Sequence, residues 1–137
     1  MTKIKLTPQT QKQLKKLGVG IVYLFGSQAE GTSHPMSDFD IGIVMKDSSK
    51  IKNQFKIHSK IYDIFNEIFP ITFKNEPDIS FLQIASPLLQ FEAINSRYIL
   101  FESSPELRAN FEEKALSRYL DFKPFINEYF QATLEAF

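Results

Sequence analysis

The sequence has 137 residues, of which 43% are hydrophobic and none is cysteine. This length and apolar content predict a single domain with a sizeable core, and the lack of cysteine excludes a disulfide framework and a zinc–thiolate site. Basic and acidic residues balance at 16 each, so no long-range charge attracts nucleic acid or an anionic membrane. No apolar run has the length of a signal-peptide core or of a membrane span. We therefore expect a cytoplasmic protein without membrane or direct nucleic-acid contact.

The first predicted elements are a helix and a buried strand. Thr7 and Pro8 are typical of an N-cap and a first helical residue, and the helix should end near Leu17, before Gly18. The next segment, Val19–Phe25, is nearly all apolar, which is typical of a strand buried on both faces.

Gly26 and Ser27 follow this strand directly. Glycine lets the backbone turn tightly and approach a ligand, and serine is a good N-cap for a short helix over residues 28–30. Free backbone N–H groups beside a hydroxyl suit a phosphate. We therefore predict a phosphate-binding role for Gly26 and Ser27, although a Gly-Ser pair alone is also typical of an ordinary turn.

Two aspartates come ten residues after Ser27. Asp38 and Asp40 stand one residue apart at the start of the next apolar run, so on a strand both carboxylates leave the same face. A bound cation would relieve the repulsion between them, and such oxygen ligands favour Mg²⁺ or Mn²⁺ over zinc. Within this strand, over residues 40–45, Gly42 allows a neighbour to approach closely.

The middle of the chain predicts one long helix and a third strand. Apolar residues recur at helical spacing from Ile51 to Phe69, which predicts a helix with a wide face packed on a sheet, ended by Pro70. Asp78 opens the next strand-like run, Asp78–Leu82, and is the third candidate metal ligand; after Pro77 it is equally typical of a turn. A helix over residues 87–95 and a short strand over 97–102 follow.

The last predicted element is a helix that begins at Ser104, Pro105 and Glu106, which suit an N-cap and a first helical turn. Pro124 should kink or break it. The segment after Pro124 is unusually apolar for a chain end. We expect part of it to pack on the core and the remainder to form an exposed patch for a protein partner. Its large apolar residues are Phe125, Ile126, Tyr129, Phe130, Leu134 and Phe137.

The run Gly26-Ser27, ten residues, then Asp38-Phe39-Asp40 resembles the signature of the DNA polymerase β-like nucleotidyltransferase superfamily. The resemblance covers roughly Val19 to Leu120, and the segments 26–31, 77–79, 86–89 and 99–102 are similar to its minimal nucleotidyltransferase (MNT) branch. It implies an α/β fold in the loose, α+β sense, with a small mixed sheet packed with helices. It also implies one domain over residues 1–137, with a core at about 19–102 and a partner-facing C-terminal helical segment over 104–137.

The resemblance implies an enzyme that depends on magnesium and uses ATP. Asp38 and Asp40 would hold two metal ions, Mg²⁺ or Mn²⁺, Asp78 would complete the site, and Gly26 and Ser27 would hold the outer phosphates. Members of the MNT branch are commonly paired with a HEPN-domain ribonuclease toxin and silence it by transferring AMP to a tyrosine. We therefore expect a hetero-oligomer with a cognate HEPN toxin.

The sequence leaves two alternatives open. Glu30 stands where family members usually carry a basic residue, and a negative charge beside the phosphates should weaken triphosphate binding. The chain would then be a non-catalytic antitoxin that neutralises the toxin by contact. The other alternative is a small-molecule nucleotidyltransferase of the aminoglycoside-modifying type, against which the absence of a sizeable substrate-binding domain argues.

Overall fold

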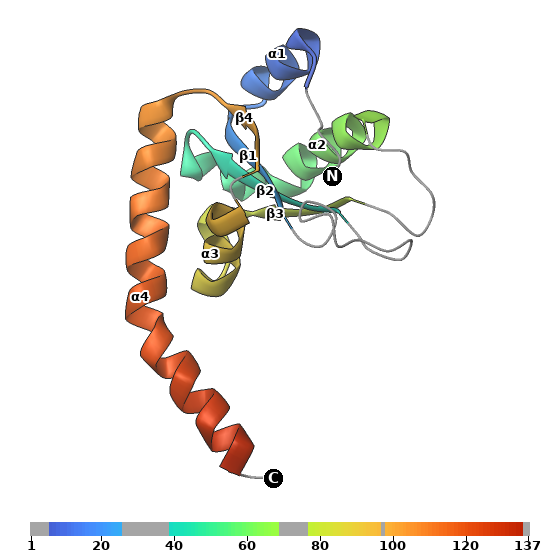
Figure 1. Cartoon of the computed structure of the whole chain (residues 1–137). Helices are drawn as coiled ribbons and strands as arrows, with labels where there is room; N and C mark the ends of the chain where they lie inside the picture. The colour runs from blue at the N-terminus through green and yellow to red at the C-terminus, as the bar shows by residue number, and fades with distance from the viewer. Residues whose placement is uncertain (1–5, 26–38, 69–76, 97, 136–137) are drawn as a thin grey trace.

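A computed structural model describes residues 6–25, 39–68, 77–96 and 98–135. Within these ranges the chain forms a mixed α/β fold with four strands and four α-helices (Figure 1). The strands are β1 (Val19–Phe25), β2 (Phe39–Met45), β3 (Pro77–Phe81) and β4 (Ile99–Glu102); the helices are α1 (Pro8–Lys16), α2 (Gln54–Ile68), α3 (Pro87–Ser96) and α4 (Pro105–Glu135).

The four strands form one mixed sheet in the order β3-β2-β1-β4. β1 runs antiparallel to β2 and β4, whereas β2 and β3 are parallel. All seven residues of β1 are buried, because this strand is central and has helices over both of its faces. The predicted fold class and the predicted doubly buried strand are therefore confirmed.

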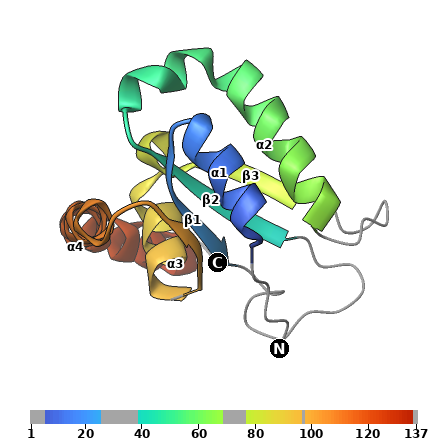
Figure 2. The same ribbon diagram turned by 90° about the horizontal axis from the view of Figure 1, so that it is seen from above.

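Helices cover the sheet in two layers. α1 and α2 lie on one face, and α3 with the first half of α4 lies on the other (Figures 1 and 2). On the first face, Ile61 and Phe65 of α2 pack with Ile41 and Ile43 of β2. On the second face the core includes Ile21, Tyr23, Phe25, Val44, Leu82 and Ala93.

The first two helices lie where the sequence predicts them, with one difference. Thr7 caps α1 by accepting a hydrogen bond from the N–H of Thr10 at 3.2 Å, and Gly18 ends the segment at a positive φ of 82°, a conformation that costs glycine little. The helix predicted from Ile51 is α-helical only from Gln54, because residues 48–53 form a tighter 3₁₀ turn. Pro70 lies outside the described residues.

The short segment between β3 and α3 packs closely against β2. A short 3₁₀ turn over residues 82–84 follows β3, and a Cβ atom at Gly42 would lie 2.7 Å from Leu82 Cδ1. This confirms the close approach predicted at Gly42. α3 begins at Pro87, and its Ser96 hydroxyl donates a hydrogen bond to the carbonyl oxygen of Leu24 at 3.1 Å.

α4 is a single helix of 31 residues with Pro124 inside it. Its first half packs on α3, where the rings of Phe91 and Tyr119 stack at 3.8 Å. Of the predicted kink or break at Pro124, the structure shows a kink: proline removes the N–H that would reach the carbonyl of Leu120, and the helix continues with a change of direction (Figure 1). In the described part of the chain, no helix is both long and apolar enough to cross a membrane.

Tyr23 is fully buried between β1 and α4, with its ring 6.2 Å from that of Phe111. Within the described ranges its hydroxyl has no hydrogen-bond partner. Burial is the largest cause that raises the pKa of Tyr23 above its usual value, and the nearby charge of Glu112 adds to it. The hydroxyl therefore contributes an unsatisfied polar group to an otherwise apolar contact.

We expect Tyr23→Phe to preserve or raise the thermal stability at neutral pH, because it removes a buried group without removing a hydrogen bond. Above pH about 10 the unfolded chain's tyrosine ionises before the buried one, so stability falls as pH rises. This fall should be smaller in Tyr23→Phe, by up to about 1.4 kcal/mol per pH unit. Thermal unfolding at pH 7, 10 and 11 measures both effects, with exposed Tyr129→Phe as the control. A destabilised Tyr23→Phe at pH 7 would contradict this assignment.

Candidate functional site

Three strand ends meet at one edge of the sheet. Antiparallel pairing places Phe25, the last residue of β1, opposite Asp40 near the start of β2. Parallel pairing then places Asp40 opposite Asp78 at the start of β3. Residues that are far apart in the sequence are thus aligned in one row across β1, β2 and β3.

Asp40 and Asp78 share a face of the sheet. Their neighbours Ile41 and Ile79 belong to the core under α1 and α2, and side chains alternate along a strand, so both aspartates belong to the α3 side. Adjacent strands lie about 4.8 Å apart, which puts the two carboxylates within reach of one cation. Asp40 is half-buried and Asp78 is exposed.

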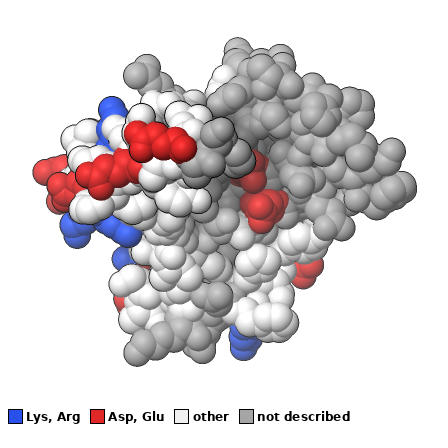
Figure 3. Space-filling model, turned by 90° about the horizontal axis from the view of Figure 1, so that it is seen from below, with Lys and Arg blue, Asp and Glu red and all other residues white. Residues whose placement is uncertain are grey.

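Among the described elements, the end of this face that carries Asp40 and Asp78 is open. α3 packs mainly on β1 and α4, and the turn over residues 82–84 covers the face only farther inward, where Leu82 lies against Gly42. Seen from below, acidic atoms lie near the centre of this side of the molecule (Figure 3). As far as the described residues show, solvent reaches the exposed Asp78 more readily than the half-buried Asp40.

Ser80 is a polar neighbour of the acidic pair that the sequence analysis did not select. It pairs with Gly42, two residues inward from Asp78 and Asp40, and so lies on the same face as the two acids. Its side chain is half-buried. The signal that could have found it is its position two residues after Asp78 on a predicted strand.

Only part of the predicted constellation falls within the described residues. The structure brings Asp40 and Asp78 together, whereas Asp38, Gly26 and Ser27 lie outside the described residues, as do Glu30 and the predicted short helix over residues 28–30. Across residues 6–25, 39–68, 77–96 and 98–135, no group of three His, Cys, Asp or Glu residues could hold a metal ion. The role of Asp38 as a third carboxylate beside Asp40 and Asp78 stays a prediction.

The described pair fits a divalent cation in its chemistry. Two carboxylates side by side on an open face supply hard oxygen ligands, which Mg²⁺ and Mn²⁺ prefer. A shallow hollow of about 250 Å³ lies instead at the far end of β2, between Val44, Gln83 and Leu107. Neither aspartate lines that hollow, so the predicted cation site and the hollow are separate features of the described structure.

The model of the family "Polymerase beta, Nucleotidyltransferase" matches residues 8–106, a range that contains both aspartates. The chain belongs to this nucleotidyltransferase family. No curated protein matches its sequence significantly.

Several solved structures resemble this nucleotidyltransferase. One is a toxin–antitoxin crystal structure with AMP-PNP, at 20% identity and a TM-score of 0.69, covering 94% of this chain and 99% of that one. Another is an MNT antitoxin in complex with the tri-AMPylated HEPN toxin of Shewanella oneidensis, at 17% identity and a TM-score of 0.61, covering 92% and 97%. A third is the toxin–antitoxin MntA–HepT, at 16% identity and a TM-score of 0.61, covering 93% and 99%. These similarities confirm the predicted polymerase β-like nucleotidyltransferase fold.

We expect Asp78→Asn to weaken Mn²⁺ binding about tenfold or more, because an amide replaces one of two adjacent carboxylates. Titration calorimetry with MnCl₂ measures the affinity, and thermal unfolding verifies that the fold is intact. Asp63→Asn is the matched control, since Asp63 is an exposed carboxylate on α2, on the opposite side of the sheet. Equal Mn²⁺ affinity in Asp78→Asn and in the unchanged protein would remove Asp78 from the metal site.

Proposed function

We propose that this nucleotidyltransferase transfers AMP from ATP to a tyrosine hydroxyl of a cognate HEPN ribonuclease toxin and thereby neutralises the toxin. The observation that carries the proposal is the register pairing of Asp40 with Asp78 on an open sheet face, in a chain of the polymerase beta nucleotidyltransferase family. Two structural relatives support the substrate and the partner: one contains AMP-PNP, and the other contains an AMPylated HEPN toxin.

In this proposal the carboxylates of Asp38, Asp40 and Asp78 hold two divalent cations, Mg²⁺ or Mn²⁺. When bound, the cations neutralise charge on the triphosphate and favour ionisation of the attacking hydroxyl. Gly26 and Ser27 hold the outer phosphates through a backbone N–H and a hydroxyl. These roles divide the site into a phosphate-binding turn after β1 and a carboxylate row across β2 and β3.

The reaction is a displacement at the α-phosphorus. The tyrosine oxygen forms a bond to this phosphorus, the bond to the β-phosphate oxygen breaks, and pyrophosphate leaves with its electron pair. Asp78 is the exposed member of the pair and lies on the side from which an acceptor can approach. We assign to it the acceptance of the hydroxyl proton.

The domain organisation follows from the same reasoning. One nucleotidyltransferase domain spans residues 1–137, with the catalytic core at about 19–102. The helix that follows, α4, serves the partner rather than the chemistry, since none of its residues belongs to the row formed by Phe25, Asp40 and Asp78.

A non-catalytic antitoxin is the second candidate, and Glu30 favours it. A carboxylate near the outer phosphates would oppose a triphosphate, while leaving contact with the toxin unaffected. The two candidates predict different results with labelled ATP: a catalytic antitoxin transfers the label to the toxin, and a non-catalytic one does not.

The test is incubation of the purified chain with α-³²P-ATP, Mg²⁺ and the proposed partner, a HEPN-domain protein from the same genome. We expect label on a tyrosine of that protein, and none with γ-³²P-ATP because pyrophosphate leaves. Asp40→Asn, alone or with Asp38→Asn, should abolish labelling but keep the complex. Neutralisation of the toxin without label would instead identify the non-catalytic antitoxin. A parallel reaction with an aminoglycoside in place of the toxin tests the third hypothesis, and label on the aminoglycoside would identify a small-molecule enzyme.

We expect Glu30→Arg to tighten Mg-ATP binding by about 1 kcal/mol, because a cation replaces an anion near the phosphates. Titration calorimetry with Mg-ATP measures this change, and Glu67→Arg on α2 provides a control with the same change in charge at an exposed position. Weaker binding to Glu30→Arg than to the unchanged protein would show that Glu30 makes a contact other than the proposed one.

A further inference from the structure

The second half of α4 is a helix with little of the protein against it. We call residues 120–135 the α4 arm. It extends past the lower end of α3 and away from the sheet (Figure 1). Phe125, Tyr129, Phe130 and Leu134 are 56–71% exposed, although each carries a large apolar side chain. Four such side chains exposed within fewer than three helical turns are unusual for a surface that faces only water.

The apolar stripe of the α4 arm continues a packing face of the first half of the helix. At 100° per residue, Phe122, Ile126 and Phe130 lie on the same side of α4 as Phe111, Ala115 and Tyr119, which form the earlier part of the stripe. The earlier part contacts the second core cluster and α3. The later part lies beyond the end of α3 and has no such neighbour in the described structure. The earlier part of this stripe is therefore already covered by a helix, α3.

The apolar area of the α4 arm fits a protein interface. Large aromatic and aliphatic side chains each present about 150–250 Å², so at their exposed fractions the arm offers on the order of 500 Å². A patch of that size matches the largest apolar patch on a typical monomer, and such patches are often functional. A stable interface buries about 800 Å² on each partner, so the arm would supply most of one side.

Charge distinguishes between the candidate occupants. The α4 arm contains three acids, Asp121, Glu128 and Glu135, and one base, Lys123, which gives a net charge of 1 − 3 = −2. A second copy of the arm would bring like charges together, which disfavours self-association. A partner with lysine or arginine beside its apolar stripe would be attracted instead.

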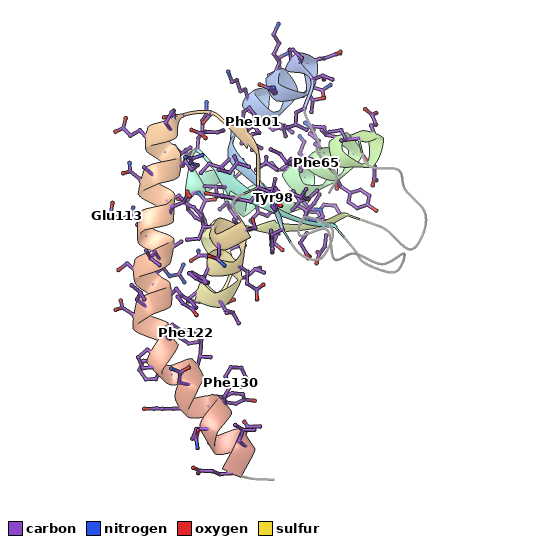
Figure 4. All side chains as sticks on the ribbon, viewed as in Figure 1. Phe65, Tyr98, Phe101, Glu113, Phe122 and Phe130 are labelled. Carbon is purple, nitrogen blue, oxygen red and sulfur yellow. The ribbon has the colours of Figure 1, made fainter. Side chains whose placement is uncertain are left out.

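The α4 arm also lies on the side of the molecule where the acidic pair is accessible. Phe130 projects from the side of the arm that lies below α3 (Figure 4), and the α3 face of the sheet carries Asp40 and Asp78. A protein seated on this stripe would lie beneath that face. The arm can therefore hold a partner while another part of the same partner reaches the carboxylates.

We propose that the α4 arm is the docking surface for the acceptor protein, and that it binds an α-helix whose apolar stripe is flanked by lysine or arginine. This inference rests on the proposed function, because it takes the bound protein to be the one that receives AMP. Docking through the arm and chemistry at the sheet edge are then separate contacts. Loss of the arm contact should raise KM for the acceptor and leave kcat near its original value.

The test uses Phe130→Lys with Leu134→Lys, which adds two cations to the apolar stripe. The matched control is Gln131→Lys with Ser117→Lys, which adds the same charge at two exposed positions of α4 on the side of the helix away from the stripe. The probe is the proposed partner, the HEPN-domain protein used in the labelling test. We expect the stripe variant to weaken its binding at least tenfold in titration calorimetry, and the control to change it less than threefold.

A second pair of substitutions separates charge from apolar contact. Phe130→Asp with Leu134→Asp should weaken binding less than the lysine variant, because a basic partner attracts the added acids. Circular dichroism and Mg-ATP binding establish that each variant is folded. If the lysine pair unfolds, the single change Tyr129→Lys takes its place and should still weaken binding.

Three results would overturn the docking proposal. Full-strength binding by the folded stripe variants would remove the α4 arm from the interface. A concentration-dependent dimer of the chain that dissociates in Phe130→Asp with Leu134→Asp, seen by sedimentation, would assign the arm to a second copy. Absence of any complex with the HEPN-domain protein would exclude that partner. Arm-dependent binding without transfer of label would overturn only the proposed function and leave the arm as a docking surface.

Discussion

The candidate site depends on the register of β2. This strand is the only one that contacts both β1 and β3, antiparallel on one side and parallel on the other. A slip of one residue would exchange its two faces, turning Asp40 toward the core and Ile41 toward the open side. The buried side chains of Ile41 and Ile43 prevent this slip because their exposure would cost about 1.5–3 kcal/mol each. The position of Asp40 is thus determined by the buried apolar residues that follow it on β2.

The same sheet explains why chemistry and partner contact can be separated. β1 is buried on both faces and connects the layer of α1 and α2 to the layer of α3 and α4. The carboxylates lie on β2 and β3, whereas α4 begins after β4 at the other edge of the sheet and projects as a helix. A partner held by α4 would therefore be positioned relative to the acids by a rigid framework.

Much of the fold could be predicted because its signals are local. The burial of Val19–Phe25, the cap at Thr7 and the close approach at Gly42 all follow from residue type and periodicity. The register that pairs Asp40 with Asp78 could not be derived from residue type and periodicity, because it depends on which strands become neighbours. Ser80 is different, since its place two residues after Asp78 follows from the alternation of side chains along one strand. Pro124 kinks α4 without breaking it, because a proline at an exposed position costs a helix one hydrogen bond and the adjoining turns remain.

The side chain of Gln83 protects a part of the sheet that lies away from the candidate site. Its side-chain amide accepts a hydrogen bond from the N–H of Met45 at 2.8 Å and donates one to the carbonyl oxygen of Met45 at 2.7 Å. β3 ends at Phe81, opposite Ile43, so Met45 extends past its neighbouring strand. Gln83 thus occupies the backbone groups that a foreign strand would need for pairing, and one side chain protects this end of the sheet against intermolecular aggregation.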